Sequence, residues 1–153
     1  MRRARAIVAS LPTHIAEREL ALIGRRLSWP AETLSTEVLT TTRSPGNIVF
    51  IEMESANLTE VFTGFGTRGV RAEAVADEAI KDARAYLANN VPVGEYLADQ
   101  LLIPLALVGG GSFITSVLSR HTTTNIEIIK KFLNVEITTS QQGRSALVEV
   151  KAD

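Results

Sequence analysis

Two short segments carry the side chains whose types and spacing best suit chemistry. The first, residues 94–101, contains Tyr96, Asp99 and Gln100, and the second contains His121, which follows Asp99 by 22 residues. A neutral imidazole can attack phosphorus, and a carboxylate can hold a divalent cation against phosphate oxygens. These groups therefore indicate a site that handles nucleotides.

The groups of the first segment share one face of an expected helix. Tyr96, Asp99, Gln100 and Ile103 are spaced at i, i+3, i+4 and i+7, which brings them together on a helix surface. A face that mixes apolar and polar groups is unusual in a packed core. The spacing by itself favours an ordinary capped surface helix with Tyr96 half-buried, and the site interpretation stays open beside it.

His121 stands just before a run of threonines that ends in Asn125. Hydroxyl and amide side chains favour a helix start, here expected near Thr122, and the N–H groups at a helix start attract anions. A nucleophile at this position would face a phosphate. The alternative is a structural or merely exposed histidine in a helix-entry loop. His14 has no such neighbours and is assigned to the helix start after Pro12.

A glycine cluster, residues 109–111, resembles a phosphate-binding loop only in composition. A phosphate loop follows a strand and opens a helix, whereas this cluster is expected to follow a helix and open a strand. It is interpreted as a helix C-terminus with a tight exit.

Composition indicates a globular protein. Of 153 residues, 45% are hydrophobic and 22% charged, so a substantial core is expected. The 5% aromatic content leaves few platforms for stacking bare bases, and the formal net charge of −1 gives no general attraction for nucleic acid. Any polyanion site must therefore be local. Basic clusters occur at 2–5, 25–26 and 130–131, and the base rate for surface charge favours a solvated face over a phosphate clamp for each.

Cysteine content and hydropathy indicate the cellular location of the protein. The chain has no cysteine, which excludes thiol catalysis and zinc-thiolate sites and suits a cytoplasmic location. The longest apolar run, residues 101–108, is far shorter than the roughly 20 residues of a membrane span. We therefore expect a cytoplasmic protein with no membrane partner.

The first ninety residues predict the element order β-α-β-β-β-α. The expected elements are strands at 4–9, 37–42, 48–53 and 58–64 and helices at 12–29 and 70–89. This order is compatible with a small thioredoxin-like α/β unit, although the Cys-x-x-Cys of redox members is absent.

From Val93 onward the expected order is α-β-α-β-β. The expected elements are helices at 93–108 and 122–133 and strands at 112–117, 135–139 and 146–150, with a hairpin turn at 141–144. The resulting class is α/β (α+β). This second unit lacks a partner strand on its own N-terminal side, so we expect an exposed sheet edge that favours self-association or pairing with another chain.

The chain resembles the C-terminal portion of RNA 3′-terminal phosphate cyclases. The segments that carry the resemblance are 93–107, 112–113, 121–126 and 132–133, with upstream similarity at 11–19, 45–47 and 58–60. The resemblance implies a large domain of three repeats, each of two helices on a four-stranded sheet, with a thioredoxin-like domain inserted in the third repeat. Residues 1–91 would be the insert domain, and 92–153 would complete the third repeat.

The resemblance also implies an activity and its residues. In the family, a histidine attacks the α-phosphorus of ATP, AMP passes to an RNA 3′-phosphate, and the adjacent 2′-hydroxyl displaces AMP to leave a 2′,3′-cyclic phosphate. His121 matches the nucleophile, and Asp99 matches the acid that supports a divalent metal, Mg²⁺ or Mn²⁺, and the phosphates. The nucleotide-contacting segment would be Tyr96, Leu97, Ala98, Asp99 and Gln100.

The chain departs from the family pattern in one respect. The two N-terminal repeats, with their Gly-rich signature and the arginine cluster that holds phosphates, have no counterpart in this sequence. Without such electrostatic stabilisation of the transition state, turnover by the chain alone is not expected. The alternative function is a non-catalytic relative that acts as a binding or assembly module.

Overall fold

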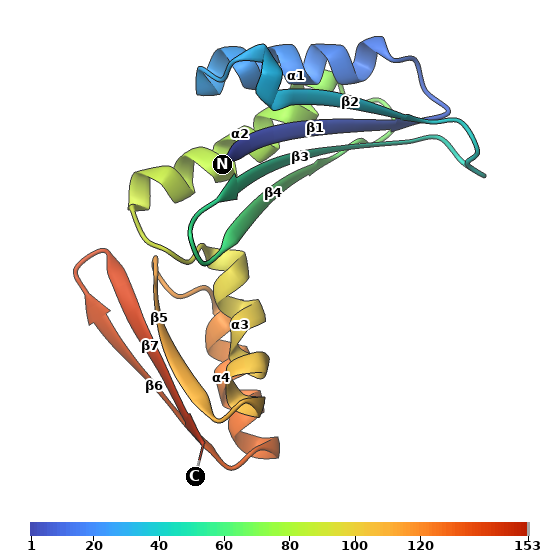
Figure 1. Ribbon diagram of the computed structural model, residues 1–153. Coiled ribbons are helices and arrows are strands. Elements are labelled where there is room, and N and C mark those ends of the chain that lie inside the picture. Colours follow the sequence, from blue (N-terminus) through green and yellow to red (C-terminus); the bar gives the residue numbers. More distant parts are fainter. Residues whose placement is uncertain (153) are drawn as a thin grey trace. The chain divides into compact units, whose positions relative to one another are not determined.

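A computed structural model describes residues 1–152 of the chain (Figure 1). Helices and strands follow the order β1-α1-β2-β3-β4-α2-α3-β5-α4-β6-β7, with a short 3-10 helix, Ala31–Thr33, before β2. The expected mixed class of helices and strands is confirmed. The chain divides into two compact units, the first from Met1 to Ala85 and the second beginning at Tyr86.

The first unit is a four-stranded sheet with two helices. Its elements are β1 (Arg2–Ala9), α1 (His14–Leu27), β2 (Leu34–Leu39), β3 (Gly46–Glu54), β4 (Thr59–Phe65) and α2 (Ala72–Asn89). The strand order is β2-β1-β3-β4, in which β1 and β2 are parallel and the other pairs antiparallel. Both helices lie on the same side of the sheet (Figure 1).

Strand periodicity explains why one face of this sheet is the core. Alternate residues point to opposite faces, and the buried set on the helix side is Ala4, Ala6, Val8, Val49, Ile51, Met53 and Phe62. The opposite face carries ion pairs across the strands, including Arg3 Nε to Glu52 Oε2 at 2.6 Å. The sheet is therefore apolar on one side and carries a mixture of charged and apolar side chains on the other.

Gly64 of β4 allows α2 to lie close to the sheet. A Cβ added at Gly64 would be 2.2 Å from the backbone carbonyl oxygen of Val75 and 3.3 Å from its Cγ1. No side chain fits at that distance. The missing side chain thus sets the position of the first turns of α2.

The predicted strand at 37–42 is wrong in its bounds, because β2 runs from Leu34 to Leu39. The β-branched run at 40–42 favoured a later strand. Pairing overrides that preference: Ala4 is opposite Leu34, Ala9 is opposite Leu39, and Ser10 then turns away with a φ of 49°. With no partner backbone beyond Ser10, residues 40–42 cannot continue the ladder.

Glu19 is a fully buried acid in the helix layer of this unit. Its exposed fraction is 0%, its Oε2 accepts a hydrogen bond of 3.0 Å from Asn47 Nδ2, and its Oε1 has no hydrogen-bond partner among the described residues. Burial raises the pKa of the Glu19 carboxyl, and the Asn47 hydrogen bond only partly opposes this. Folding therefore shifts this carboxyl towards its protonated form.

We expect Glu19→Gln to remove a pH-dependent cost of folding. Because the pKa is raised in the folded state, the stability contributed by protonated Glu19 is present below its ordinary value of 4.5 and is lost as pH rises through the folded pKa. Over that window the free energy of unfolding of the wild type should fall by up to about 1.4 kcal/mol per pH unit relative to Glu19→Gln. Urea unfolding followed by the fluorescence of buried Trp29, the single tryptophan, measures this.

The control for this prediction is Glu17→Gln, an exposed carboxyl on the same helix. Its stability should follow the pH dependence of the wild type. Parallel curves for the wild type and Glu19→Gln would contradict the assignment of a raised pKa.

The second unit is a three-stranded sheet covered by two helices on one face (Figure 1). Its elements are α3 (Glu95–Leu107), β5 (Gly110–Thr115), α4 (Arg120–Phe132), β6 (Val135–Gln142) and β7 (Ser145–Ala152), and the antiparallel order is β5-β7-β6. The core is formed by Leu102, Ala106, Phe113, Ile126, Ile129, Ile137, Val148 and Val150. Gly143 makes the β6–β7 turn at a φ of 64°.

The glycine cluster leads from α3 into β5, as expected. Gly109 has a φ of 98° directly after the helix, and Gly110 already pairs with Lys151. A Cβ at Gly110 would lie 2.6 Å from the Val150 carbonyl oxygen. Strand β5 therefore starts two residues earlier than predicted and ends at Thr115, where the pairing with β7 ends.

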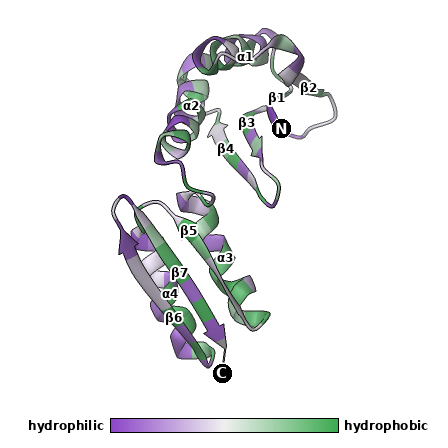
Figure 2. Cartoon of the chain, turned by 60° about the vertical axis from the view of Figure 1, so that its left-hand side comes forward, coloured by the Kyte–Doolittle hydropathy of each residue, from purple (hydrophilic) through white to green (hydrophobic). Residues whose placement is uncertain are grey.

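The hydropathy of the helices also bears on membranes. Figure 2 shows α3 as the most apolar helix, with green along much of its length. Among the described residues, no helix combines the length and hydropathy needed to cross a bilayer.

Candidate functional site

Helix α4 starts earlier than the sequence predicted, and this changes the setting of His121. Ser119 is the N-cap, and its Oγ accepts a hydrogen bond of 3.1 Å from the Thr122 backbone N–H. The prediction of a helix start near Thr122, with His121 in a preceding loop, is therefore wrong. A serine in the extended conformation caps the helix better than the threonines, which lie inside the first turn.

His121 is the second residue of α4, and its side chain is exposed. The N–H groups of the first helical turn have no carbonyl partner within the helix, so they form an anion-attracting end. Arg120 adds a positive charge immediately before the histidine. An imidazole here is accessible and lies where a phosphate would be stabilised.

The segment predicted to contact a nucleotide forms the first turns of α3. Tyr96 is 61% exposed, Gln100 is exposed, Asp99 and Leu97 are partly buried, and Ala98 is buried. The mixed face noted in the sequence is therefore a surface face, which explains why polar and apolar residues share it.

One hydrogen bond connects the two candidate segments. Asn125 Nδ2 donates to Asp99 Oδ1 at 2.7 Å, which joins α3 to α4. Asn125 follows His121 by four residues, so the two lie on the same side of α4 about 6 Å apart along its axis. The bond therefore connects Asp99 to a residue that lies one helical turn from His121.

Asp99 retains capacity for a further ligand. A carboxylate has about four acceptor positions, and Asn125 uses one. No group of three or more His, Cys, Asp or Glu suited to a metal occurs in the part of the chain that the structure describes. A single carboxylate is nevertheless a usual anchor for Mg²⁺ when substrate phosphates and water supply the other ligands. The residues present therefore fit a cation that arrives with a nucleotide.

Sequence reasoning missed the role of Asn125. The sequence suggested only that Asn125 helps to start the helix, whereas its side chain donates a hydrogen bond to Asp99, the candidate acid of the other segment. The i+4 spacing of Asn125 from His121 could have revealed that the two share a helix face. A helix expected to start near Thr122 would not include His121, so the spacing was not used.

Comparison with known proteins gives consistent similarities. A family model described as the insert domain of RNA 3′-terminal phosphate cyclase (RTC) matches residues 1–88. A protein of Ectopseudomonas mendocina named RNA 3′-terminal phosphate cyclase is 48% identical over 145 residues, which is 95% of this chain and 42% of that protein.

Other relatives with the same name are similar over nearly the same length. The Koribacter versatilis protein is 46% identical over 94% of this chain and 40% of its own length. The Salmonella enteritidis protein is 40% identical over 96% of this chain and 43% of its own length. The chain thus spans about two-fifths of the length of the curated relatives it matches. Because the insert-domain model matches more than half of the chain, the chain belongs to the RNA 3′-terminal phosphate cyclase family.

Proposed function

We propose that the chain forms the insert domain and the nucleotidyl-transferring part of an RNA 3′-terminal phosphate cyclase. In this proposal residues 1–91 are the insert domain and 92–153 complete the last repeat of the large domain. The observation that supports it best is the Asp99–Asn125 hydrogen bond, which connects a carboxylate of α3 to the residue one turn after an exposed histidine at the N-terminus of α4.

The proposed reaction has three steps. An imidazole nitrogen of His121 attacks the α-phosphorus of ATP and pyrophosphate leaves. An oxygen of the RNA 3′-phosphate then attacks the same phosphorus, and the imidazole leaves. Finally the 2′-hydroxyl attacks the activated 3′-phosphorus, AMP leaves, and the 2′,3′-cyclic phosphate remains.

The residues of the chain have distinct tasks in the proposal. Asp99 would hold a Mg²⁺ or Mn²⁺ ion that neutralises the triphosphate, and Asn125 would position Asp99. The exposed ring of Tyr96 offers a surface for adenine.

The surfaces of the second unit support association with the rest of a cyclase. Strand β5 is an edge strand, and Val93 forms an isolated parallel bridge with Thr115 on the side of β5 away from β7. Large apolar side chains on α3 and α4 are also exposed: Ile103 (48%), Leu107 (69%) and Phe132 (82%). We propose that a further strand pairs with β5, from the portion of the relatives that this chain does not match or from a second copy of the chain.

A reconstitution assay tests the proposal. The chain is mixed with the unmatched N-terminal portion of the Ectopseudomonas mendocina relative, ATP, Mg²⁺ and an RNA with a 3′-phosphate. The 3′-phosphate should become resistant to phosphatase as the cyclic ester forms. Asp99→Asn should lower the rate roughly 100-fold, because it keeps an oxygen for Asn125 but removes the charge.

The matched control is Asp77→Asn, an exposed acid of α2, which should leave the rate unchanged. If the two portions associate but no cyclic ester forms, the alternative function, a non-catalytic binding or assembly module, is favoured.

A further inference from the structure

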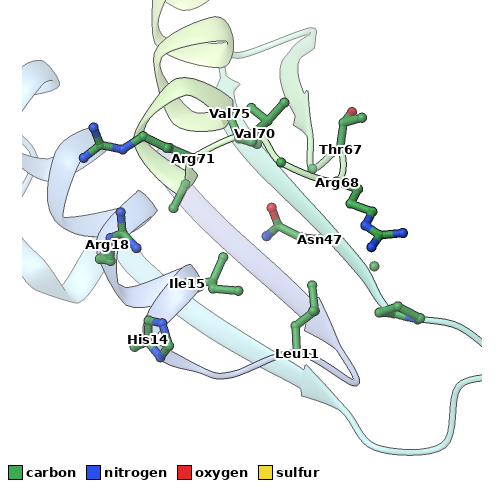
Figure 3. Close-up of a pocket in the computed structure, with 15 residues that line it drawn as sticks. Leu11, His14, Ile15, Arg18, Asn47, Thr67, Arg68, Val70, Arg71 and Val75 are labelled. Atoms are coloured by element: carbon green, nitrogen blue, oxygen red, sulfur yellow. The ribbon is translucent and has the colours of Figure 1, made fainter.

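The first unit contains a cavity of about 660 Å³ that includes none of the candidate-site residues of the second unit (Figure 3). Its lining comes from the start of α1, the start of β3 and the segment 66–72 that leads into α2. All the lining residues belong to the first unit. The volume lies within the range of about 300–1,000 Å³ that is usual for small-molecule sites.

The charged part of the cavity wall is positive. Arg18, Arg68 and Arg71 line it. The adjacent carboxylate of Glu73 receives two hydrogen bonds from Arg18, at 2.8 and 2.7 Å, and lies 3.6 Å from Arg71 Nε. The Arg18 hydrogen bonds lower the pKa of Glu73, which therefore stays ionised. Three guanidinium groups against one carboxylate leave an excess of positive charge.

Arg68 is the cation that this carboxylate does not engage. It forms no ion pair with any residue in the described range 1–152. It sits in a tight turn in which the Val70 N–H donates to the Thr67 carbonyl at 2.9 Å and Gly69 has a φ of 84°. Figure 3 shows Arg68 on one side of Asn47 and Arg18 on the other.

The rest of the wall is apolar, with one fixed amide. Leu11, Ile15 and Val75 contribute hydrocarbon surface. Asn47 is held from behind by Glu19, whose Oε2 accepts from Asn47 Nδ2 at 3.0 Å. The cavity thus combines a positive rim, an apolar wall and a polar group of fixed orientation.

From these features we propose that the cavity binds a nucleoside phosphate, with the phosphomonoester held by Arg68 at one side of the cavity (Figure 3). A phosphomonoester carries up to two charges and several acceptor oxygens, which matches an excess of guanidinium groups better than a single carboxylate does. The N-termini of α1 and α2 border the same space and favour an anion there. The nucleoside covers the apolar wall. The site is independent of the chemistry proposed for His121.

Amide chemical-shift titration of the 153-residue chain tests this proposal. Adenosine 3′-monophosphate should shift the signals of Asn47 and of residues 67–71 in a saturable way, and adenosine without phosphate should not. Arg68→Gln should weaken the affinity roughly tenfold, because one charge-assisted hydrogen bond is lost. Arg25→Gln, in the last turn of α1, is the matched control and should bind like the wild type.

Further measurements identify the source of the ligand and distinguish this binding site from the proposed chemistry of His121. If a short RNA with a 3′-phosphate binds at least as tightly as the mononucleotide, the ligand of the site is an RNA end. If such RNA does not displace the mononucleotide, the ligand is a free nucleotide. His121→Ala should leave this binding unchanged, whatever its effect on catalysis. The proposal would be overturned if the chemical-shift changes were confined to residues 119–125. It would also be overturned if Arg68→Gln bound adenosine 3′-monophosphate as tightly as the wild type, or if an acidic peptide bound as tightly as the nucleotide.

Discussion

Replacement of His121 by alanine should abolish covalent transfer of AMP to the chain. With ATP labelled at the α-phosphate, a divalent metal and the unmatched N-terminal portion of a relative, the wild type should acquire label that acid releases, as a phosphoramidate requires. His121→Ala has no nitrogen at that position to attack phosphorus, so labelling should fall to background. Autoradiography of the denatured protein after acid or alkaline treatment measures the adduct.

Two controls sharpen this prediction. His14, the other histidine of the chain, lies in the first unit, so His14→Ala should be labelled like the wild type. The chain without the N-terminal portion should acquire little label, because the arginine cluster expected in that portion, which would offset the charge of the triphosphate, is then absent. Equal labelling of the wild type and His121→Ala would exclude His121 as the nucleophile.

A methyl group at Gly64 should strongly destabilise the first unit. The added Cβ of Gly64→Ala would be 2.2 Å from the Val75 carbonyl oxygen, which is backbone and cannot rotate away as a side chain would. Helix α2 must move outward and lose contacts of Val75 and Ala79, both buried. We expect a loss of about 3 kcal/mol in the free energy of unfolding, at the upper end of overpacking effects. Urea unfolding followed by Trp29 fluorescence measures it.

Gly46→Ala is the matched control in the same sheet. A Cβ at Gly46 would meet only the Ala9 Cβ at 3.9 Å, an ordinary contact, so its effect should be small. Similar midpoints for the two variants would show that α2 adjusts freely and that Gly64 is not required for its position.

The two largest predictions rest on different kinds of information. His121 was recognisable from the sequence because its residue type and motif identify it before any coordinates are known. Gly64 was not, because a glycine in a strand does not reveal which backbone approaches it. Only the packed position of α2 shows that the carbonyl of Val75 occupies the space of a side chain.

Sequence alone determined the order of helices and strands, the mixed class and the side chains of the candidate site. Hydrophobic spacing along α1 and α2 and the turn residues at 45–47 and 143 are local signals, and local signals survive in a linear chain. They do not determine which segments pair or pack, because those depend on partners distant in sequence.

Tertiary structure decided the features that depend on such partners. Strand β2 ends at Leu39 because β1 supplies no further backbone, despite the β-branched residues that follow. The hydrogen bond from Asn125 to Asp99 forms across 26 residues because α4 packs beside α3, which no local signal of the sequence reveals. In the sequence Glu19 is an ordinary acid of a helix, and only its burial in the folded unit raises the pKa of its carboxyl. In each case desolvation or backbone pairing with a remote segment outweighed the local preference of the residue itself.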